Sequence, residues 1–207
     1  NPDSLAIDVG ANIGQMTSIL ALRTGPKGHV IALEPHPDVY EHLLSNTVRF
    51  NEHPSLATVE AKNIALSSST GVARLAWSER FEHNKGVAYI TSSPDSGIST
   101  PCCKLDEILS GRPVSVVKVD VEGHELPVLR GGVNAIESGV VSNIVYEYHS
   151  PTSPEIHNFL ESRGFSIFGL GWCYRGPVLI PYRVEPRELS SASNYLATRD
   201  PSQVKTR

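Results

Sequence analysis

Short apolar runs of strand length recur along the chain, and most of them are followed by apolar residues at helical spacing. The runs span residues 5–9, 29–33, 56–62, 114–119 and 140–148. Strands that alternate with helices form a parallel sheet whose faces the helices cover. The pattern therefore predicts an α/β fold.

The fourth of these runs, Val114–Val119, is nearly all apolar. A strand buried on both faces of a sheet has such a continuous apolar sequence. We expect this strand at the centre of the sheet. Two last strands are predicted at Phe165–Leu170 and Asn194–Thr198, and the Pro-, Gly- and aromatic-rich stretch 171–190 between them is expected to be a loop near the substrate mouth.

Residues 70–109 do not form a plain strand–helix unit. Apolar and polar positions alternate over Val72–Trp77, which predicts a strand. The polar stretch 78–99 contains one weak strand at Val87–Ile90, and we expect a mobile insertion there that covers the ligand side. An extended segment, Thr100–Leu105, and a short helix to Leu109 follow.

Composition adds limits to this picture. The chain has 207 residues, 40% hydrophobic and 19% charged, which suits one domain over residues 1–207. A net charge of −4 argues against a nucleic-acid partner. No apolar run reaches the roughly 18 residues that cross a bilayer, and no signal peptide precedes Leu5, so we expect a cytoplasmic protein with no membrane partner. The three cysteines have no zinc spacing and are expected to be reduced.

The first strand ends in a glycine turn with the sequence D-V-G-A-N-I-G. Glycine supplies positive φ or lets the backbone approach a ligand closely, and the helix that follows offers free N–H groups. The turn is therefore a candidate nucleotide site. It departs from the dinucleotide pattern G-x-G-x-x-G because Asn12 and Gln15 replace glycines. A tight turn without a ligand is the alternative.

A carboxylate also ends the second strand. Glu34 lies about 20 residues beyond Gly14, the place where nucleotide-binding α/β folds hold both ribose hydroxyls. A solvated acid at the end of a strand is the alternative interpretation.

Acids and histidines gather after the fourth and fifth strands, at the sheet edge where α/β proteins bind ligands. Either a general base or a divalent cation bound by oxygen ligands is compatible with this cluster. The candidate catalytic residues are Asp120, Glu122, His124, Glu147 and His149, and no metal ligand is assigned.

Five motifs occur in a fixed order: DVGANIGQMT, LEPHP, NIALS, KLDEIL and KVDVEGHELPVLRGG. Together they resemble the FkbM family of methyltransferases, over roughly Leu5–Tyr148. The resemblance implies the Rossmann-like class I methyltransferase fold, a mostly parallel seven-stranded sheet with helices on both faces and a C-terminal antiparallel hairpin. It also implies S-adenosylmethionine as cofactor and O-methylation of a small-molecule hydroxyl on a natural product or sugar.

The resemblance also implies a role for each matching position. The methionine end of the cofactor would be held by Asp8, Gly10, Ala11, Asn12 and Gly14. Glu34, beside Pro35, would bind the ribose, and Asn63 and Ile64 the adenine. Asp120 and Glu122 would lie where methyl donor and acceptor meet.

Two other functions remain possible at this stage. An NAD(P) oxidoreductase shares the fold, but Asn12 and the absence of a Tyr-x-x-x-Lys pair disfavour it. A methyltransferase-like binding module without activity is the second alternative.

Overall fold

The computed structural model describes residues 3–77, 88–91, 93, 97–148, 154–173, 176–182 and 193–204, with the side chains of 172 and 173 excepted. Most of the predicted insertion at 78–99, and half of the predicted loop at 171–190, lie outside these residues. None of the helices in these ranges is long and apolar enough to span a membrane.

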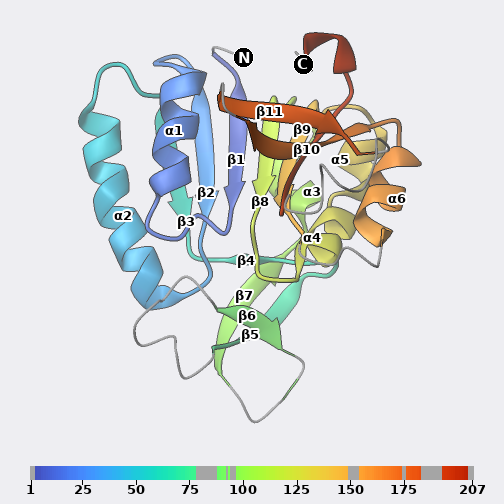
Figure 1. Cartoon of the computed structure of the whole chain (residues 1–207). Coiled ribbons are helices and arrows are strands. Elements are labelled where there is room, and N and C mark those ends of the chain that lie inside the picture. The colour runs from blue at the N-terminus through green and yellow to red at the C-terminus, as the bar shows by residue number, and fades with distance from the viewer. Residues whose placement is uncertain are drawn as a thin grey trace.

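In the described part of the chain, eight strands form the main sheet, in the order β11-β10-β12-β9-β8-β1-β2-β3 (Figure 1). Their bounds are β1 Leu5–Val9, β2 His29–Leu33, β3 Thr58–Lys62, β8 Val116–Val119, β9 Asn143–Glu147, β10 Ser166–Cys173, β11 Gly176–Pro181 and β12 Asn194–Thr198. The five strands from β3 to β9 pair in parallel, whereas β12, β10 and β11 pair antiparallel. The predicted α/β class, with a mostly parallel sheet and an antiparallel end, is confirmed.

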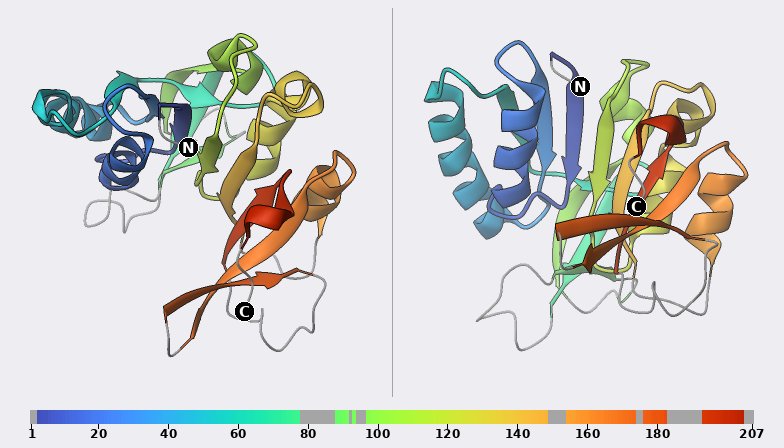
Figure 2. Two further views of the ribbon diagram at one scale, coloured as in Figure 1. Left: turned by 90° about the horizontal axis from the view of Figure 1, so that it is seen from above. Right: turned by 45° about the horizontal axis from the view of Figure 1, so that its top comes forward.

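Helices cover the sheet from both sides (Figures 1 and 2). The helices are α1 Gln15–Thr24, α2 Pro37–Glu52, α3 Leu105–Leu109, α4 Glu125–Gly131, α5 Val133–Glu137 and α6 Glu155–Glu161, with a 3-10 turn at Pro201–Gln203. Alternate residues of β1 enter different cores, because successive side chains of a strand point to opposite faces. Ala6 packs with Ala21 of α1 and Leu43 of α2, whereas Ile7 packs in the core that holds Leu129 of α4.

The strand β8 lies between β1 and β9, as its apolar sequence predicts. Val117 and Val119 are completely buried on the α4 side. Its central place puts residue 120, at its end, beside the glycine turn that follows β1.

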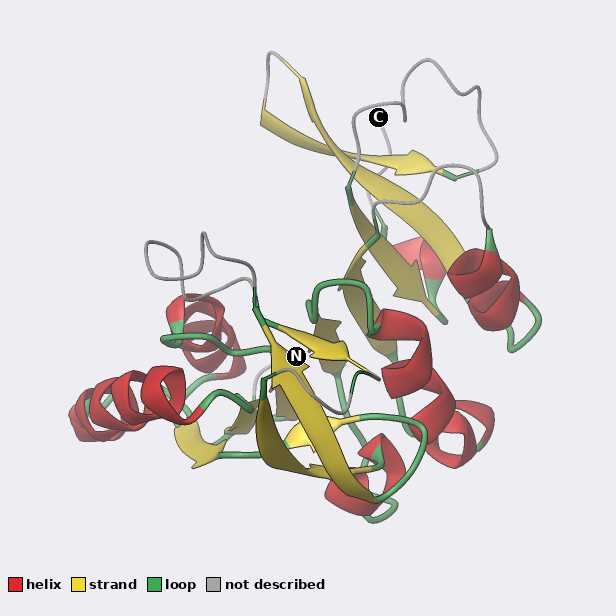
Figure 3. Cartoon of the chain, turned by 90° about the horizontal axis from the view of Figure 1, so that it is seen from below, coloured by secondary structure: helices red, strands yellow, loops and turns green. Residues whose placement is uncertain are grey.

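A second sheet, with four strands among the described residues in the order β4-β7-β5-β6, lies beyond the carboxyl ends of the parallel strands (Figures 1 and 3). Its strands are β4 Ala65–Leu66, β5 Gly71–Ala76, β6 Tyr89–Thr91 and β7 Ile98–Cys103. The strands predicted near 72–77 and 87–90 are confirmed as β5 and β6. Cys102 and Cys103 of β7 are buried and form no disulfide.

The expected number of strands in the main sheet is wrong. Over the described residues, the main sheet has eight strands instead of seven, because Gly176–Pro181, expected as part of a loop, forms β11. Pro177 and Pro181 make this segment look like a loop. Proline is tolerated on an edge strand, where its missing N–H costs no ladder bond, and β11 is the edge of the sheet.

Candidate functional site

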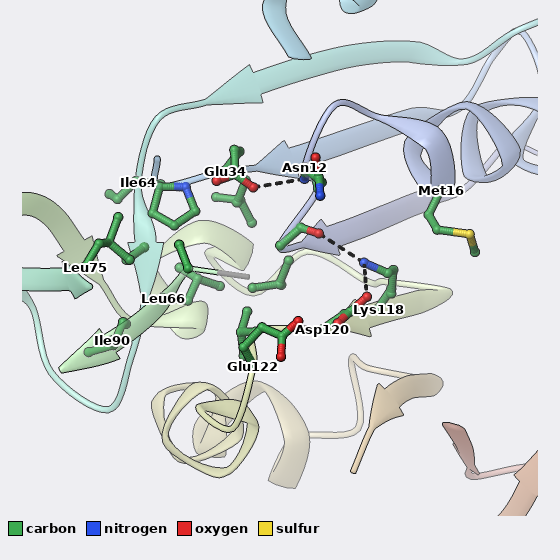
Figure 4. A pocket seen from close by; sticks show the side chains of 18 of the residues that line it. Asn12, Met16, Glu34, Ile64, Leu66, Leu75, Ile90, Lys118, Asp120 and Glu122 are labelled. Atoms are coloured by element: carbon green, nitrogen blue, oxygen red, sulfur yellow. Dashed lines mark hydrogen bonds and ion pairs between the residues drawn. The ribbon is translucent and has the colours of Figure 1, made fainter. Parts of the chain in front are cut away.

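A cavity of about 540 Å³ opens at the carboxyl ends of β1, β2 and β8 (Figure 4). This size is within the usual range for small-molecule sites. Predicted residues that line the cavity are Gly10, Ala11, Asn12, Glu34, Pro35, Ile64, Asp120, Glu122 and Glu147. Four others, Asp8, Gly14, Asn63 and His124, are described by the structure but do not line the cavity. His149 lies outside the described residues.

The glycine turn links three strands at one end of the cavity. Both Gly10 N and Ala11 N donate hydrogen bonds to the Leu33 carbonyl at the end of β2, each at 3.0 Å. Gly10 has φ +75°, and a Cβ there would lie 1.9 Å from the carbonyl oxygen of Asp120. Only glycine permits this approach. The turn is therefore fixed by backbone packing before any ligand binds.

Gly14 lies beside α2 and does not line the cavity. It has φ +94°, and an added Cβ would lie 3.0 Å from Leu43 Cδ1 and 3.2 Å from Phe50 Cε2, both on α2. Its small size lets the start of α1 pack against α2. It supports the turn from behind the cavity.

Asp8 lies beneath the turn and is completely buried. Thr17 Oγ1 donates to Asp8 Oδ2 at 2.6 Å, and Lys118 Nζ lies 3.1 Å from Asp8 Oδ1. These contacts tie β1 to α1 and to β8. The Asp8 carboxylate does not line the cavity, and it lies behind the turn that does.

Lys118 is a charged residue of the cavity lining that the sequence analysis missed. Besides Asp8, its ammonium group contacts the Gly10 carbonyl at 3.1 Å and Asp120 Oδ2 at 3.4 Å (Figure 4). A usable signal was present, because a lysine within an apolar central strand must find a partner. The register pairs it directly with Asp8 across β8 and β1.

Glu34 is 7% exposed and joins two loops at the cavity wall. Its Oε2 accepts a hydrogen bond from Asn12 N, and its Oε1 accepts one from His36 N, both at 2.9 Å. Burial raises the pKa of Glu34, while these two backbone N–H groups act in the opposite direction. The carboxylate is thereby fixed in position, and each oxygen retains capacity to accept a further hydrogen bond.

Asn63 holds the backbone beside Glu34. Its Nδ2 donates to the carbonyls of Glu34 and Pro35, at 2.8 and 3.1 Å. The neighbouring Ile64 lines the cavity instead. Of the two residues expected to contact the adenine, the structure therefore places only Ile64 at the cavity.

One wall of the cavity is apolar and comes largely from the second sheet. Figure 4 shows Ile64, Leu66, Leu75 and Ile90 together on this wall, from β4, β5, β6 and the segment before β4. Such a surface suits the faces of a planar ring. From the described part of the stretch 78–99, Ala88 and Ile90 line the cavity.

Asp120, Glu122 and Glu147 supply carboxylates to the cavity from the ends of β8 and β9. Glu122 has φ +49°, and Gly123 has φ +90°. Glu125, buried in the first turn of α4, accepts hydrogen bonds from Val121 N at 3.3 Å and Gly123 N at 3.0 Å. Glu125 thus fixes the turn that presents Glu122.

His124 points away from this group. Its Nε2 lies 2.9 Å from Ser67 Oγ, and burial lowers the pKa of its imidazole. Glu122 and His124 are close in the sequence, but only Glu122 lines the cavity. No group of three His, Cys, Asp or Glu side chains in the described ranges is arranged to hold a metal ion.

At one end of the cavity, the fixed carboxylate of Glu34 lies beside the apolar wall, and the carboxylates of Asp120, Glu122 and Glu147 lie at the other end. The Glu34 carboxylate and the apolar wall together suit a nucleoside, whose ribose hydroxyls donate hydrogen bonds and whose base is flat. The carboxylates at the other end are suited to accept a proton or to orient a polar reactant.

Comparison with known proteins agrees with this geometry. The family model described as the methyltransferase FkbM domain matches residues 8–167. The hexuronic acid methyltransferase AglP of Haloferax volcanii is 34% identical over 158 residues, which cover 74% of this chain and 59% of that protein. Methyltransferase sdnD of Sordaria araneosa is 30% identical over 194 residues, 78% of this chain and 73% of that protein.

Among solved structures, the methyltransferase FkbM of Methylobacillus flagellatus superposes with a TM-score of 0.62 at 18% identity. The match covers 95% of this chain and 44% of that one, so this chain spans less than half of that relative. The order of the motifs, the fold and the matched family model agree, and the chain belongs to the FkbM methyltransferase family.

Proposed function

We propose that this chain is an S-adenosylmethionine-dependent methyltransferase that methylates an oxygen of a small molecule. The observation that carries the proposal is the carboxylate of Glu34, held by Asn12 N and His36 N at the edge of a cavity of nucleoside size. The names of the two relatives, a hexuronic acid methyltransferase and a second methyltransferase, support it.

The cavity fits the cofactor on features of its own. Glu34 has capacity to accept hydrogen bonds from ribose hydroxyls, and Ile64 and Leu75 offer an apolar surface to the adenine. The Gly10–Asn12 backbone lies beside Asp120 and would hold the methionine end. When bound, S-adenosylmethionine supplies an electrophilic methyl group on a positively charged sulfur.

The remaining work falls on residues that position and deprotonate the acceptor. Aligning the acceptor oxygen with the methyl group provides much of the rate enhancement in such a displacement. A hydroxyl acceptor also needs a base, and Glu122 and Glu147 line the cavity where one would act. His149, from just beyond β9, stays a candidate base from the sequence. Asp120 has one oxygen beside the Lys118 ammonium and is better suited to orient a ligand.

The acceptor is proposed as a class. The relative named for a hexuronic acid directs attention to sugars and sugar acids. Hydroxyl and carboxylate oxygens are both acceptors within that class. We favour a hydroxyl, because the described residues that line the cavity offer carboxylates and no free cation to bind a substrate carboxylate.

Two assays test the proposal. Isothermal titration should show one-site binding of S-adenosylhomocysteine, and NADH titrated in parallel should give no binding. Release of S-adenosylhomocysteine should then be followed with neutral sugars and uronic acids as acceptors, with and without EDTA. Retained activity in EDTA supports a side-chain base, whereas loss that Mg²⁺ restores supports a divalent ion. Tight NADH binding without S-adenosylhomocysteine binding would refute the proposal.

A further inference from the structure

Lys118 occupies an unusual place for a lysine. It lies within β8, the central strand of the main sheet, and it is only 8% exposed. Lysine is rarely buried unless its charge is paired. Its ammonium nitrogen lies 3.1 Å from Asp8 Oδ1, 3.1 Å from the Gly10 carbonyl oxygen and 3.4 Å from Asp120 Oδ2.

These three contacts surround the ammonium group with oxygens. A lysine ammonium group has three N–H donors and no acceptor. The Gly10 carbonyl accepts a hydrogen bond from it, and the carboxylates of Asp8 and Asp120 form ion pairs with it. Lys118, Gly10 and Asp120 all line the cavity, so the ammonium group holds two other groups of the cavity wall beside each other.

Neutralising Asp8 does not explain all three contacts. Asp8 is completely buried and needs a cation beside it, and one ion pair with Lys118 would be enough for that purpose. The ammonium group also bridges the turn after β1 and the carboxylate after β8 (Figure 4). The Asp120 side chain is 40% exposed, so solvent would otherwise leave it free to adopt several rotamers.

Resting on the proposed function, we propose that Lys118 is a positioning residue of the cofactor site. Its ammonium group sets the Gly10 carbonyl and the Asp120 carboxylate in a fixed relation, so that the turn and the end of β8 present one preformed surface to the methionine end of the cofactor. Preorganisation of this kind raises affinity because less order must be imposed on binding.

The test must separate this role from the pairing of Asp8. Lys118→Met alone leaves a buried carboxylate unpaired, so the comparison is made in the Asp8→Asn background. Asparagine at position 8 still accepts the hydrogen bond from Thr17 and carries no charge. The contacts of Lys118 with Gly10 and Asp120 are then present in Asp8→Asn and absent in Asp8→Asn/Lys118→Met. Lys62→Met, at the end of β3 and outside the cavity, is the matched control.

The dissociation constant of S-adenosylhomocysteine is measured by calorimetry, and the melting temperature of each variant without ligand is recorded. At similar melting temperatures, Asp8→Asn/Lys118→Met should bind roughly tenfold more weakly than Asp8→Asn, the scale of one charge-assisted hydrogen bond. Asp8→Asn/Lys118→Arg should lie between the two, because the planar guanidinium rescues some but not all of a tetrahedral donor set. Lys62→Met should match the wild type.

Equal affinity in Asp8→Asn and Asp8→Asn/Lys118→Met would overturn the proposal and leave Lys118 a purely structural residue. If the methionine variant does not fold, the arginine variant decides, and an affinity equal to that of Asp8→Asn would overturn the proposal. Failure of the proposed function looks different, because the folded wild type and Lys62→Met would then not bind S-adenosylhomocysteine at all.

Discussion

Two polar clusters lie at different places in this fold, and they differ in that one holds charged side chains and the other a neutral histidine. At the cavity, Asp8 and Asp120 flank Lys118, and every member of the cluster has an oppositely charged neighbour. On the α6 side of the sheet, His157 is 2% exposed, and neither of its ring nitrogens has a hydrogen-bond partner in the described part of the chain. The first cluster keeps its charges inside the protein, whereas the second excludes charge.

The surroundings of His157 explain this exclusion. Its ring contacts those of Tyr146, Tyr148, Tyr182 and Tyr195, at centroid distances from 3.9 to 5.9 Å. Burial lowers the pKa of His157 to about 4, although Glu161 acts in the opposite direction. A neutral histidine fills space among aromatic rings. Of these two clusters, the one that holds charged groups lies at the end of the sheet where the ligand is proposed to bind.

The largest expected effect comes from breaking the charged cluster. Lys118→Met should lower the free energy of unfolding by about 3–5 kcal/mol, because it strands the carboxylate of Asp8 without its cation. Urea denaturation followed by circular dichroism measures this change. Adding Asp8→Asn should recover most of the loss, and a Lys118→Met variant as stable as the wild type would contradict the account of the cluster.

A second prediction concerns the other buried carboxylate at the cavity. Glu34→Ala should weaken S-adenosylhomocysteine binding by roughly 1.5–3 kcal/mol, since hydrogen bonds to a charged group are lost. Calorimetry measures this value, and Glu60→Ala at the exposed edge strand β3 is the control. The pKa of Glu34 is raised above its ordinary value of 4.5, so Glu34 takes up a proton at a higher pH than a free glutamate does. When the solution is acidified, wild-type affinity should therefore begin to fall before pH 4.5 is reached. Unchanged affinity in Glu34→Ala would remove Glu34 from the site.

The neutral cluster predicts a smaller effect on stability that depends on pH. The unfolded chain takes up a proton on His157 near its ordinary pKa of 6.5, whereas the folded chain does so near 4. The stability that comes from keeping His157 neutral is therefore fully present above pH 6.5 and is lost as the pH falls from 6.5 towards 4. At pH 5 this effect lowers the free energy of unfolding by roughly 1–2 kcal/mol.

Denaturation of His157→Phe at pH 7 and pH 5 tests this point. The variant should lose less stability between the two pH values than the wild type does. His42→Phe, at an exposed position of α2, should keep the full loss. Equal losses in the wild type and His157→Phe would show that His157 takes no part in the acid sensitivity.

The smallest effect is expected from Asn63, whose amide holds the backbone beside Glu34 from outside the cavity. Asn63→Ala should weaken S-adenosylhomocysteine binding by about 0.5–1.5 kcal/mol, the range for neutral hydrogen bonds. Ile64→Ala, which removes an apolar surface from the cavity wall, should have at least as large an effect. A stronger loss in Asn63→Ala than in Glu34→Ala would reverse the proposed ranking of the site.

Much of the order of strands and helices could be predicted from the sequence, because the central strands β1, β2 and β8 are apolar runs and apolar residues recur at helical spacing after them. The place of Glu34 followed from its position at a strand end. The strand β11 could not be predicted in this way, because its prolines and glycine are typical of a loop unless the strand is known to lie at an edge.

Side-chain direction was the harder part of the site. Asp8 follows the same face of β1 as Ala6 and meets Lys118 and Thr17 beneath the turn, which spacing along one strand does not reveal. The side chains of Glu122 and His124 point in different directions, because the backbone between β8 and α4 has positive φ at Glu122 and Gly123. Gly10 looks like a ligand-binding glycine, yet its close approach to Asp120 already requires it. A Gly10→Val variant would therefore disturb the fold as well as any bound cofactor.

A crystal structure of the chain with S-adenosylhomocysteine tests the central claim most directly. The account predicts the ribose hydroxyls at the Glu34 carboxylate, the adenine against Ile64 and Leu75, and the sulfur between the glycine turn and Asp120. Density for the ligand elsewhere, or in the cavity with no contact to Glu34, would contradict it.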